Sequence, residues 1–258
     1  MNNILIKVEN LVKTFGGLVA LNDCSLEIKD KAITGIIGPN GSGKTTLFNV
    51  ITGNLKPDTG KVFYNGVEIT NEESHDLFHL GVLRTFQIAH EFSNMTVIEN
   101  LMVVPGNQKG EKLLYSLMNS SKIKKEDELI KDKAMEVLKF LKIEHLKNER
   151  AGNLSGGQKK LLELARTMMV DAKIVFLDEV GAGVNKTLLR DISDSILKLN
   201  QDKGYTFCMI EHDFNFISEL CDPVIVLAEG SVLFKGSAED VKSNEQVIES
   251  YLGKGLKK

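Results

Sequence analysis

The chain has 258 residues, 42% of them hydrophobic and 26% charged, and its formal net charge at pH 7 is -3. This balance is ordinary for a soluble globular protein, and it excludes a strongly basic nucleic-acid binder. No run approaches the roughly 18 apolar residues that span a bilayer, and the charged N-terminus lacks the apolar block of a signal peptide. The three cysteines are widely spaced and suit a reducing compartment. We therefore expect a cytoplasmic protein with no nucleic-acid partner.

The N-terminal part of the chain combines predicted strands with one helix. Alternating or continuously apolar patterns predict three strands, at residues 4–12, 20–30 and 31–38. The third strand leads into a glycine-rich loop and a predicted helix over 45–53. Asn65 and Gly66 favour a tight turn, which predicts a β-hairpin over 61–69.

The middle of the chain, from residue 96 to about 170, has no convincing strand pattern. Thr96 and Glu99 have the spacing of a capping box, which predicts the start of a helix. Apolar residues then recur at helical spacing, with four on or near one face: Leu129, Met135, Leu138 and Leu141. This region is expected to be a helical insertion.

Strands return in the last third of the chain. Apolar stretches at 173–179, 204–211 and 222–230 are separated by predicted helices, and a further strand is predicted at 231–236. Strands that alternate with helices indicate a parallel sheet covered by helices. The sequence therefore predicts an α/β fold.

Residues 38–45, GPNGSGKT, fit the pattern G-x-x-x-x-G-K-[ST] of a phosphate-binding loop. Its glycines let successive backbone N–H groups face phosphates, and the following helix adds the positive end of its dipole. Lys44 would place a positive charge at the β- and γ-phosphates, and the Thr45 hydroxyl could bind Mg²⁺. The motif predicts nucleotide binding without choosing among an ATPase, a GTPase and a kinase. The sequence lacks the N-K-x-D pattern for a guanine base, which weakens the GTPase reading.

A second glycine-rich motif, LSGGQ, occupies residues 154–158 and precedes a strongly amphipathic stretch. Ser155 and Gln158 have capping-box spacing, so Ser155 should lie at a helix N-terminus. Free N–H groups and the helix dipole would make this terminus a second anion site.

Two carboxylates, Asp178 and Glu179, follow directly after the apolar stretch 174–177. Acids at the end of a buried strand are unfavourable unless they hold a cation or take part in proton transfer. Small residues come next, and they permit close approach of the backbone to a partner. We therefore expect these acids to hold a cation or to move a proton.

Taken together, these motifs resemble those of the ATP-binding-cassette (ABC) ATPases. Further residues fall in that family's order: Phe15 matches the aromatic that stacks on adenine, and Gln87 matches the glutamine at the join to the helical subdomain. Residues 174–179 match the Walker B strand, and His212 matches the switch histidine. The resemblance runs from about residue 4 to 253.

The resemblance implies an ABC-type P-loop ATPase with a mixed core sheet, an antiparallel β subdomain and an inserted helical subdomain. A single domain of this type would fill residues 1–258. Its nucleotide-binding core would comprise 1–86 and 166–258, and its helical subdomain would span about 87–165.

The resemblance also implies ATP and Mg²⁺ as ligands. It gives catalytic roles to Lys44 at the phosphates, to Glu179 as the group that polarises the attacking water, and to His212 as the group that orients the γ-phosphate. It places Mg²⁺ at Thr45, with Gln87 and Asp178 close by. The implied nucleotide-binding set is Phe15, Gly38, Pro39, Asn40, Gly41, Ser42, Gly43, Lys44, Thr45, Thr46, Gln87, Ser155, Gly156, Gly157 and Gln158.

By the family's geometry, Ser155 and Gly157 close over the ATP of a second ATP-binding subunit in a head-to-tail pair, either a homodimer or a heterodimer. The segment 81–103 is most similar to the ATP-binding subunits of branched-chain amino-acid importers and their urea and amide relatives. That resemblance implies transmembrane permease subunits as partners and a peripheral position on the inner face of the cell membrane.

Three side chains near Gln87 are candidates for permease contacts or for packing within the subdomain: Phe86, Phe92 and Met95. Two alternatives to an importer stay open. One is a soluble ABC ATPase in cofactor assembly, and the other is the ATPase subunit of an exporter.

The segment after the two acids departs from the commonest family form. Val180 stands where that form has proline, and Asn185 stands where it has aspartate. The branched-chain amino-acid group often has asparagine at the second position, which supports the subfamily assignment. Asn185 can still cap a helix that starts at Lys186, although it carries no charge.

Overall fold

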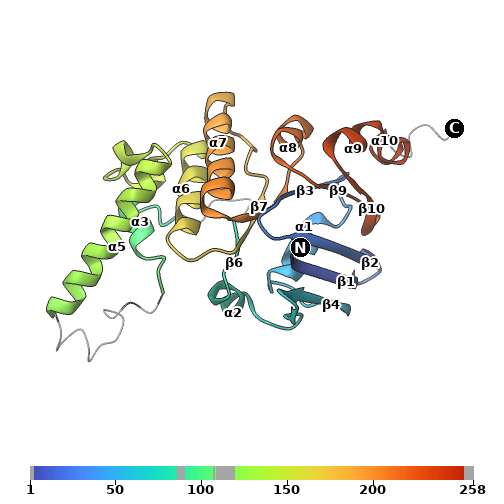
Figure 1. The fold of residues 1–258 in the computed structure, drawn as a ribbon, viewed down its shortest axis with the longest axis horizontal. Coiled ribbons are helices and arrows are strands. Elements are labelled where there is room, and N and C mark those ends of the chain that lie inside the picture. The colour runs from blue at the N-terminus through green and yellow to red at the C-terminus, as the bar shows by residue number, and fades with distance from the viewer. Residues whose placement is uncertain (1–2, 86–90, 107, 109–119, 253–258) are drawn as a thin grey trace. The chain divides into compact units, whose positions relative to one another are not determined.

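A computed structural model describes residues 3–85, 91–106, 108 and 120–252. The chain divides into two compact units (Figure 1). The first contains residues 1–87, 173–181 and 197–258, and the second contains 88–172 and 182–196. The division predicted from the sequence, with a helical subdomain over about 87–165, stays a prediction.

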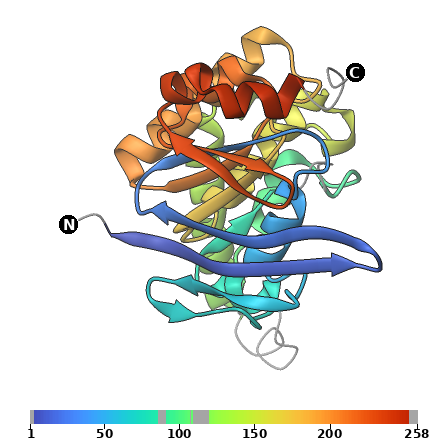
Figure 2. The ribbon, with the colours of Figure 1, turned by 90° about the vertical axis from the view of Figure 1, so that its right-hand side faces the viewer.

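The first unit contains a four-stranded antiparallel sheet with the order β2-β1-β4-β5. Its strands are β1 (Ile4–Phe15), β2 (Leu18–Lys29), β4 (Thr59–Tyr64) and β5 (Val67–Glu68). Figure 2 shows β1 and β2 as one long antiparallel ribbon. The predicted hairpin is confirmed, because β4 and β5 pair through a turn in which Asn65 and Gly66 both have positive φ.

The second sheet of this unit has six strands in the order β10-β9-β3-β8-β7-β6. Its strands are β3 (Ile33–Ile37), β6 (Val82–Arg84), β7 (Ile174–Asp178), β8 (Thr206–Ile210), β9 (Val224–Ala228) and β10 (Ser231–Gly236). All neighbours are parallel except β9 and β10. Every residue of β3, β7 and β8 is buried, which explains their uninterrupted apolar sequences.

The carboxyl ends of β3, β7 and β8 meet at one edge of this sheet because the strands are parallel neighbours. The glycine-rich loop leaves β3 there, Asp178 ends β7, and Glu211 follows β8. Ligands of open α/β sheets bind at this edge. The topology therefore brings together three segments that are far apart in the sequence.

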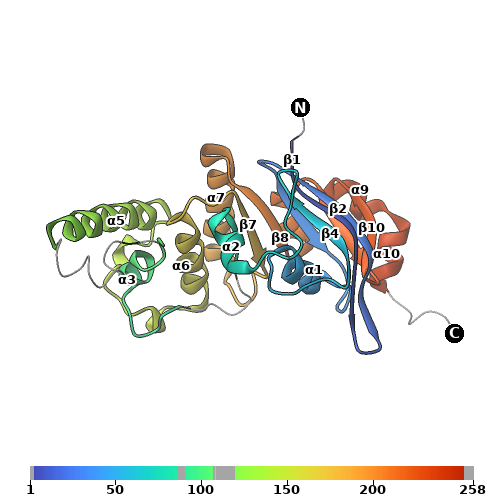
Figure 3. The ribbon, with the colours of Figure 1, turned by 90° about the horizontal axis from the view of Figure 1, so that it is seen from below.

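Helix α1 (Lys44–Ile51) packs between the two sheets of the first unit (Figure 3). The ring of Phe48 is fully buried and meets that of Phe176 edge-on, with centroids 5.0 Å apart. Burying a phenyl side chain contributes about 1.5–3 kcal/mol, so this contact holds α1 in place. The remaining helices that include residues of this unit are α2 (Ser74–His79), α7 (Lys186–Lys203), α8 (Phe214–Leu220), α9 (Ala238–Ser243) and α10 (Glu245–Leu252).

The regular elements described in the second unit are helical. They are α3 (Val97–Met102), α5 (Ser120–Phe140), η2 (Glu144–Leu146), η3 (Ala151–Asn153), α6 (Gly156–Met168) and the first part of α7. The capping box of Thr96 and Glu99 is confirmed. Along α5, Leu138 is buried but Leu129 is 70% exposed, so the expected apolar face does not extend to Leu129. Within the described ranges, no helix is long and apolar enough to cross a membrane.

Candidate functional site

The glycine-rich loop between β3 and α1 has a backbone that side chains would not permit. Gly43 is the N-cap of α1 and has φ of +100°, in the left-handed region. A Cβ on Gly38 would overlap with the carbonyl of Leu227. No side chain caps α1, so the N–H groups of its first turn are available to a ligand. These features make the loop a cradle for an anion at a helix N-terminus.

The side chain of Lys44 lies inside this loop. It is 6% exposed, and its ammonium donates hydrogen bonds to the carbonyls of Gly38 at 2.8 Å and Pro39 at 3.0 Å. Burial lowers the pKa of Lys44, while the charges of Glu179 and Asp178 oppose that shift. The loop thus holds a positive charge beside its backbone N–H groups.

The hydroxyl of Ser42 provides a test of whether the loop fits a phosphate. Ser42 is 2% exposed, and its Oγ makes no hydrogen bond to any residue that the structure describes. A buried hydroxyl without a partner is unfavourable by about 1–3 kcal/mol. A phosphate oxygen in the cradle would supply the missing acceptor, so the loop fits a nucleotide phosphate.

One cavity of about 250 Å³ joins this loop to residues from other parts of the first unit. Phe15, at the end of β1, lines it and is 48% exposed, so its ring offers an open apolar face. Glu179 and His212 line it as well. The complete lining is Phe15, Leu18, Val19, Ala20, Asn40, Gly41, Ser42, Gly43, Lys44, Thr45, Thr46, Glu179 and His212.

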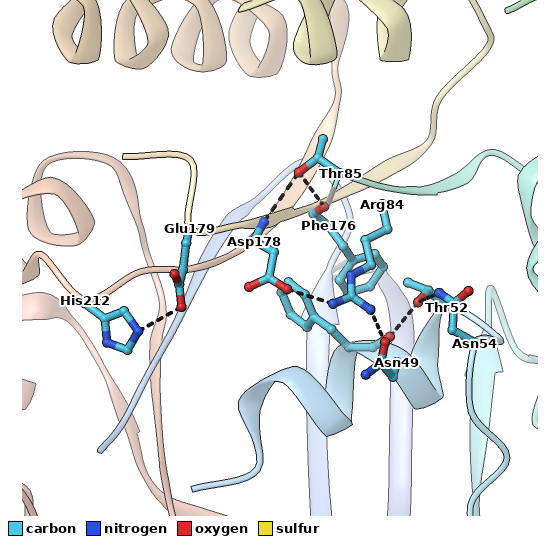
Figure 4. Close-up of polar contacts among 10 residues, drawn as sticks. Asn49, Thr52, Asn54, Arg84, Thr85, Phe176, Asp178, Glu179 and His212 are labelled. Carbon is cyan, nitrogen blue, oxygen red and sulfur yellow. Dashed lines mark hydrogen bonds and ion pairs between the residues drawn. The ribbon is translucent and has the colours of Figure 1, made fainter. Parts of the chain in front are cut away.

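Glu179 and His212 form a pair at this cavity. The Nε2 atom of His212 lies 2.9 Å from Oε1 of Glu179 (Figure 4). The side chain of Glu179 is 18% exposed and that of His212 is 50% exposed. Both groups can therefore reach a ligand in the cavity. The sequence placed these residues in one site, but it did not predict their contact.

Asp178 forms a buried ion pair that sequence reasoning missed. Its Oδ2 accepts a hydrogen bond of 2.7 Å from Arg84, and the two side chains are only 3% and 7% exposed. Arg84 also donates to Asn49 and lies 5.8 Å from the centroid of the Phe48 ring. The available signal was a charged residue directly after the two apolar residues 82–83. The second oxygen of Asp178 points away from Arg84 (Figure 4).

Of the three predicted magnesium ligands, two lie within the described residues. Thr45 lies on the first turn of α1 and lines the cavity, and Asp178 ends β7. Gln87 lies outside the described residues. Within the described part of the chain, no group of three or more histidine, cysteine, aspartate or glutamate residues could hold a metal. A hydroxyl and a carboxylate oxygen fit Mg²⁺, which usually binds one or two carboxylates together with substrate phosphates.

The LSGGQ motif belongs to the second unit and forms the predicted helix N-terminus. Ser155 Oγ accepts from the N–H of Gln158 at 3.4 Å, and the Gln158 side chain accepts from the N–H of Ser155 at 2.9 Å. This confirms the capping box. Gly156 has open space around it, whereas a Cβ on Gly157 would overlap with Leu188.

Asn185 caps α7 as predicted, because its side-chain oxygen accepts from the N–H of Leu188 at 3.0 Å. Val180 is 5% exposed and therefore packs as a core residue in the position where the commonest family form has proline.

The first unit thus has a phosphate cradle after the buried strand β3 and two acids at the end of β7, with β8 between these two strands in the sheet. A buried lysine and a histidine complete the arrangement. This combination defines the class of P-loop nucleotide-binding proteins.

Comparison with known proteins narrows this class. Residues 21–182 match the protein family described as ABC transporter. The probable branched-chain amino acid transport ATP-binding protein LivG of Archaeoglobus fulgidus is 43% identical, over 96% of this chain and 95% of that protein. The high-affinity branched-chain amino acid transport ATP-binding protein BraF of Pseudomonas aeruginosa is 34% identical, over 98% of this chain and 99% of that protein.

Similar solved structures point to the same family. The ADP conformation of an ATP-binding cassette of an ABC transporter has a TM-score of 0.83 at 41% identity, covering 97% of this chain and 99% of that one. A dimeric structure of a bacterial ABC transporter cassette has a TM-score of 0.74 at 25% identity, covering 91% and 99%. The chain therefore belongs to the ABC transporter family, and it is an ATP-binding subunit with ATPase activity. The predicted fold class is confirmed.

Proposed function

We propose that this ATPase subunit drives the import of branched-chain amino acids through separate permease subunits. The observation that carries the ATPase site is the single cavity that joins Phe15, the glycine-rich loop, Glu179 and His212. The names of the relatives support the solute class. In this proposal the chain lies on the inner face of the cell membrane, bound to its permease.

In the proposed complex the adenine ring stacks on Phe15, whose exposed ring needs only a flat partner. The phosphates lie on the backbone N–H groups at the start of α1. Lys44 then exchanges its carbonyl partners for phosphate oxygens, which makes charge-assisted hydrogen bonds. The Ser42 hydroxyl gains an acceptor at the same step.

The side chains that we propose to hold Mg²⁺ are Thr45, Asp178 and Gln87. The chemistry that the ion supplies when bound is neutralisation of charge on the transferring phosphoryl group. Arg84 keeps the Asp178 carboxylate oriented by binding one of its oxygens, and it leaves the other oxygen free to face the site.

Hydrolysis depends mainly on positioning, because phosphoryl transfer needs little covalent help from the protein. We assign Glu179 to polarise the attacking water and His212 to orient the γ-phosphate and that water. The two side chains lie within hydrogen-bonding distance of each other, at 2.9 Å, so both are near the same part of the cavity. No side chain needs to act as a nucleophile.

We further propose that the N-terminus of α6 binds the ATP of a second ATP-binding subunit. Its Ser155 cap leaves N–H groups and the positive end of the helix dipole available for an anion. The family also includes a dimeric cassette, which supports a head-to-tail pair. ATP would then hold two subunits together, and hydrolysis would release them.

Ser155→Arg tests this arrangement. The bulky cation should block closure of the dimer and reduce turnover by at least about tenfold, while the monomer still binds ATP at its own glycine-rich loop. Analytical ultracentrifugation with ATP and equilibrium binding of a fluorescent ATP analogue measure the two effects. Ser237 is a matched control because it caps α9 with the same side-chain pattern, so Ser237→Arg should dimerise normally. Loss of ATP binding by the Ser155→Arg monomer would contradict a contact made in trans.

The permease contact is proposed to include Phe92 and Met95 of the second unit. Phe92 is 51% exposed, and the guanidinium of Arg166 lies 5.5 Å from its ring centroid. Met95 is half-buried. Phe86, the third candidate, lies outside the described residues. Aromatic residues, methionine and arginine are enriched at the cores of protein interfaces.

Phe92→Asp should lower ATP-driven transport by about tenfold or more, since interface anchors contribute roughly 2 kcal/mol or more. ATP hydrolysis by the isolated subunit should stay unchanged. Transport in proteoliposomes and hydrolysis by the free subunit are the two measurements. Leu129→Asp is the control, because Leu129 is a 70% exposed apolar residue of the same unit. Equal transport by both variants would remove Phe92 from the interface.

Co-purification from membranes tests the proposed function as a whole. The permease partner should be recovered with the subunit, and the reconstituted complex should take up leucine only with ATP. ATP-driven release of solute would instead favour an exporter. A soluble assembly ATPase would be recovered without any membrane protein.

A further inference from the structure

The backbone of Glu179 has an unusual conformation. Its φ is +51°, in the left-handed region that non-glycine residues rarely adopt. Such a conformation persists only when surrounding contacts fix it, and it is unfavourable by about 1–3 kcal/mol. One restraint is the hydrogen bond of 2.9 Å from the N–H of Glu179 to the carbonyl of Ile210, at the end of β8.

A second restraint comes from Glu211, the next residue after β8. Its Oε1 accepts a hydrogen bond of 2.8 Å from the N–H of Gly181. Glu211 is 5% exposed, and it does not line the nucleotide cavity. Burial raises the pKa of Glu211, and the backbone N–H groups of Gly181 and His212 oppose that shift. A buried acid that takes no part in the proposed hydrolysis therefore requires an explanation.

These two hydrogen bonds tie the segment 179–181 to the end of β8. The N–H of residue 179 is held by Ile210, and the N–H of residue 181 is held by Glu211. His212, which contacts Glu179, is the neighbour of Glu211 in the chain. Gly181 is also the last residue of the first unit before the chain enters 182–196 of the second. The Glu211 side chain thus fixes the backbone at the point where the chain leaves the site.

We infer that Glu211 is a positioning residue. By accepting a hydrogen bond from the Gly181 N–H, it keeps Glu179 and His212 in their positions relative to each other. This inference rests on the proposed roles of Glu179 and His212. It assigns no contact between Glu211 and ATP. Removing the acceptor should let Glu179 leave its left-handed conformation, and small displacements of catalytic groups have large effects on rate.

Glu211→Met and Glu211→Gln provide the test. Methionine fills similar space without an acceptor, whereas the glutamine amide oxygen can still accept the Gly181 N–H. We expect Glu211→Met to lower kcat by about tenfold to a hundredfold, with KM for ATP and the Kd of a fluorescent ATP analogue within about twofold of wild type. Glu211→Gln should restore most of kcat. If the methionine variant does not fold, Glu211→Ser replaces it, because serine cannot reach Gly181.

Thr206→Val is the matched control. Thr206 begins the same strand, β8, does not line the cavity, and accepts a hydrogen bond from the N–H of Lys31 at 2.9 Å through its hydroxyl. Thr206→Val should lose about as much stability as Glu211→Met does, but it should keep the wild-type kcat. The inference would be overturned if Glu211→Met matched this control in kcat, or if Glu211→Gln were as slow as Glu211→Met. Normal hydrolysis by Glu179→Gln would instead overturn the proposed site and would say nothing against the Gly181 hydrogen bond.

Discussion

Glu179→Gln should reduce ATP turnover by about 10²–10⁴-fold, which is the usual contribution of a positioned general base. ATP binding should persist, because the substitution removes one charge without changing the glycine-rich loop or the volume of the side chain. Glu179 lines the cavity and lies 2.9 Å from His212, and the expected loss rests on its proposed role at the attacking water. Single-turnover hydrolysis and equilibrium ATP binding separate the two effects.

The same variant should accumulate as an ATP-bound dimer, because the step that releases the two subunits has been slowed. Size-exclusion chromatography with and without ATP measures this. Glu219→Gln is the control, since Glu219 is an exposed glutamate on α8 in the same unit. Near-normal turnover by Glu179→Gln would remove Glu179 from the role of base, whatever the state of assembly.

Arg84→Met is expected to have the largest effect on stability. It keeps an apolar stem near Phe48 but leaves the carboxylate of Asp178 buried and unpaired. Breaking a buried ion pair at one partner lowers the free energy of unfolding by about 3–5 kcal/mol. Urea denaturation should therefore show a clearly lower midpoint than wild type.

The double variant Arg84→Met/Asp178→Asn separates charge from packing. It should recover part of the lost free energy of unfolding, because no uncompensated charge remains. Together with the two single variants it forms a double-mutant cycle, which gives the coupling energy between the two side chains. Lys61→Met, at the exposed ion pair with Glu68, should leave the midpoint essentially unchanged. If Arg84→Met behaved like Lys61→Met, the Arg84 pair would not be an essential support of Asp178.

Sequence reasoning worked best where the signal is local. The hairpin at Asn65 and Gly66, the capping boxes of Thr96 and Ser155, and the Asn185 cap each follow from residues within a few positions of one another. The glycine-rich loop is local in the same sense, because the positive φ of Gly43 and the burial of Lys44 follow from a single short motif.

The exposure of Leu129 was not predictable in this way. Helical periodicity identifies a possible apolar face, but the tertiary packing decides how far along the helix that face is covered. Leu138 is covered and Leu129 is not, although both fit the same period. The contact between Arg84 and Asp178 spans 94 positions, and nothing in either segment specifies the other.

The sequence by itself determined the nucleotide-binding class and the family, because phosphate-binding loops, strand ends and helix caps each depend on a short continuous stretch of residues. Only the tertiary structure decided which residues support them: Arg84 on Asp178, Glu211 on Gly181, and the close approach of His212 to Glu179. The physical reason is the parallel sheet. It places the ends of β3, β7 and β8 side by side, so groups separated by many residues in the chain come within hydrogen-bonding distance.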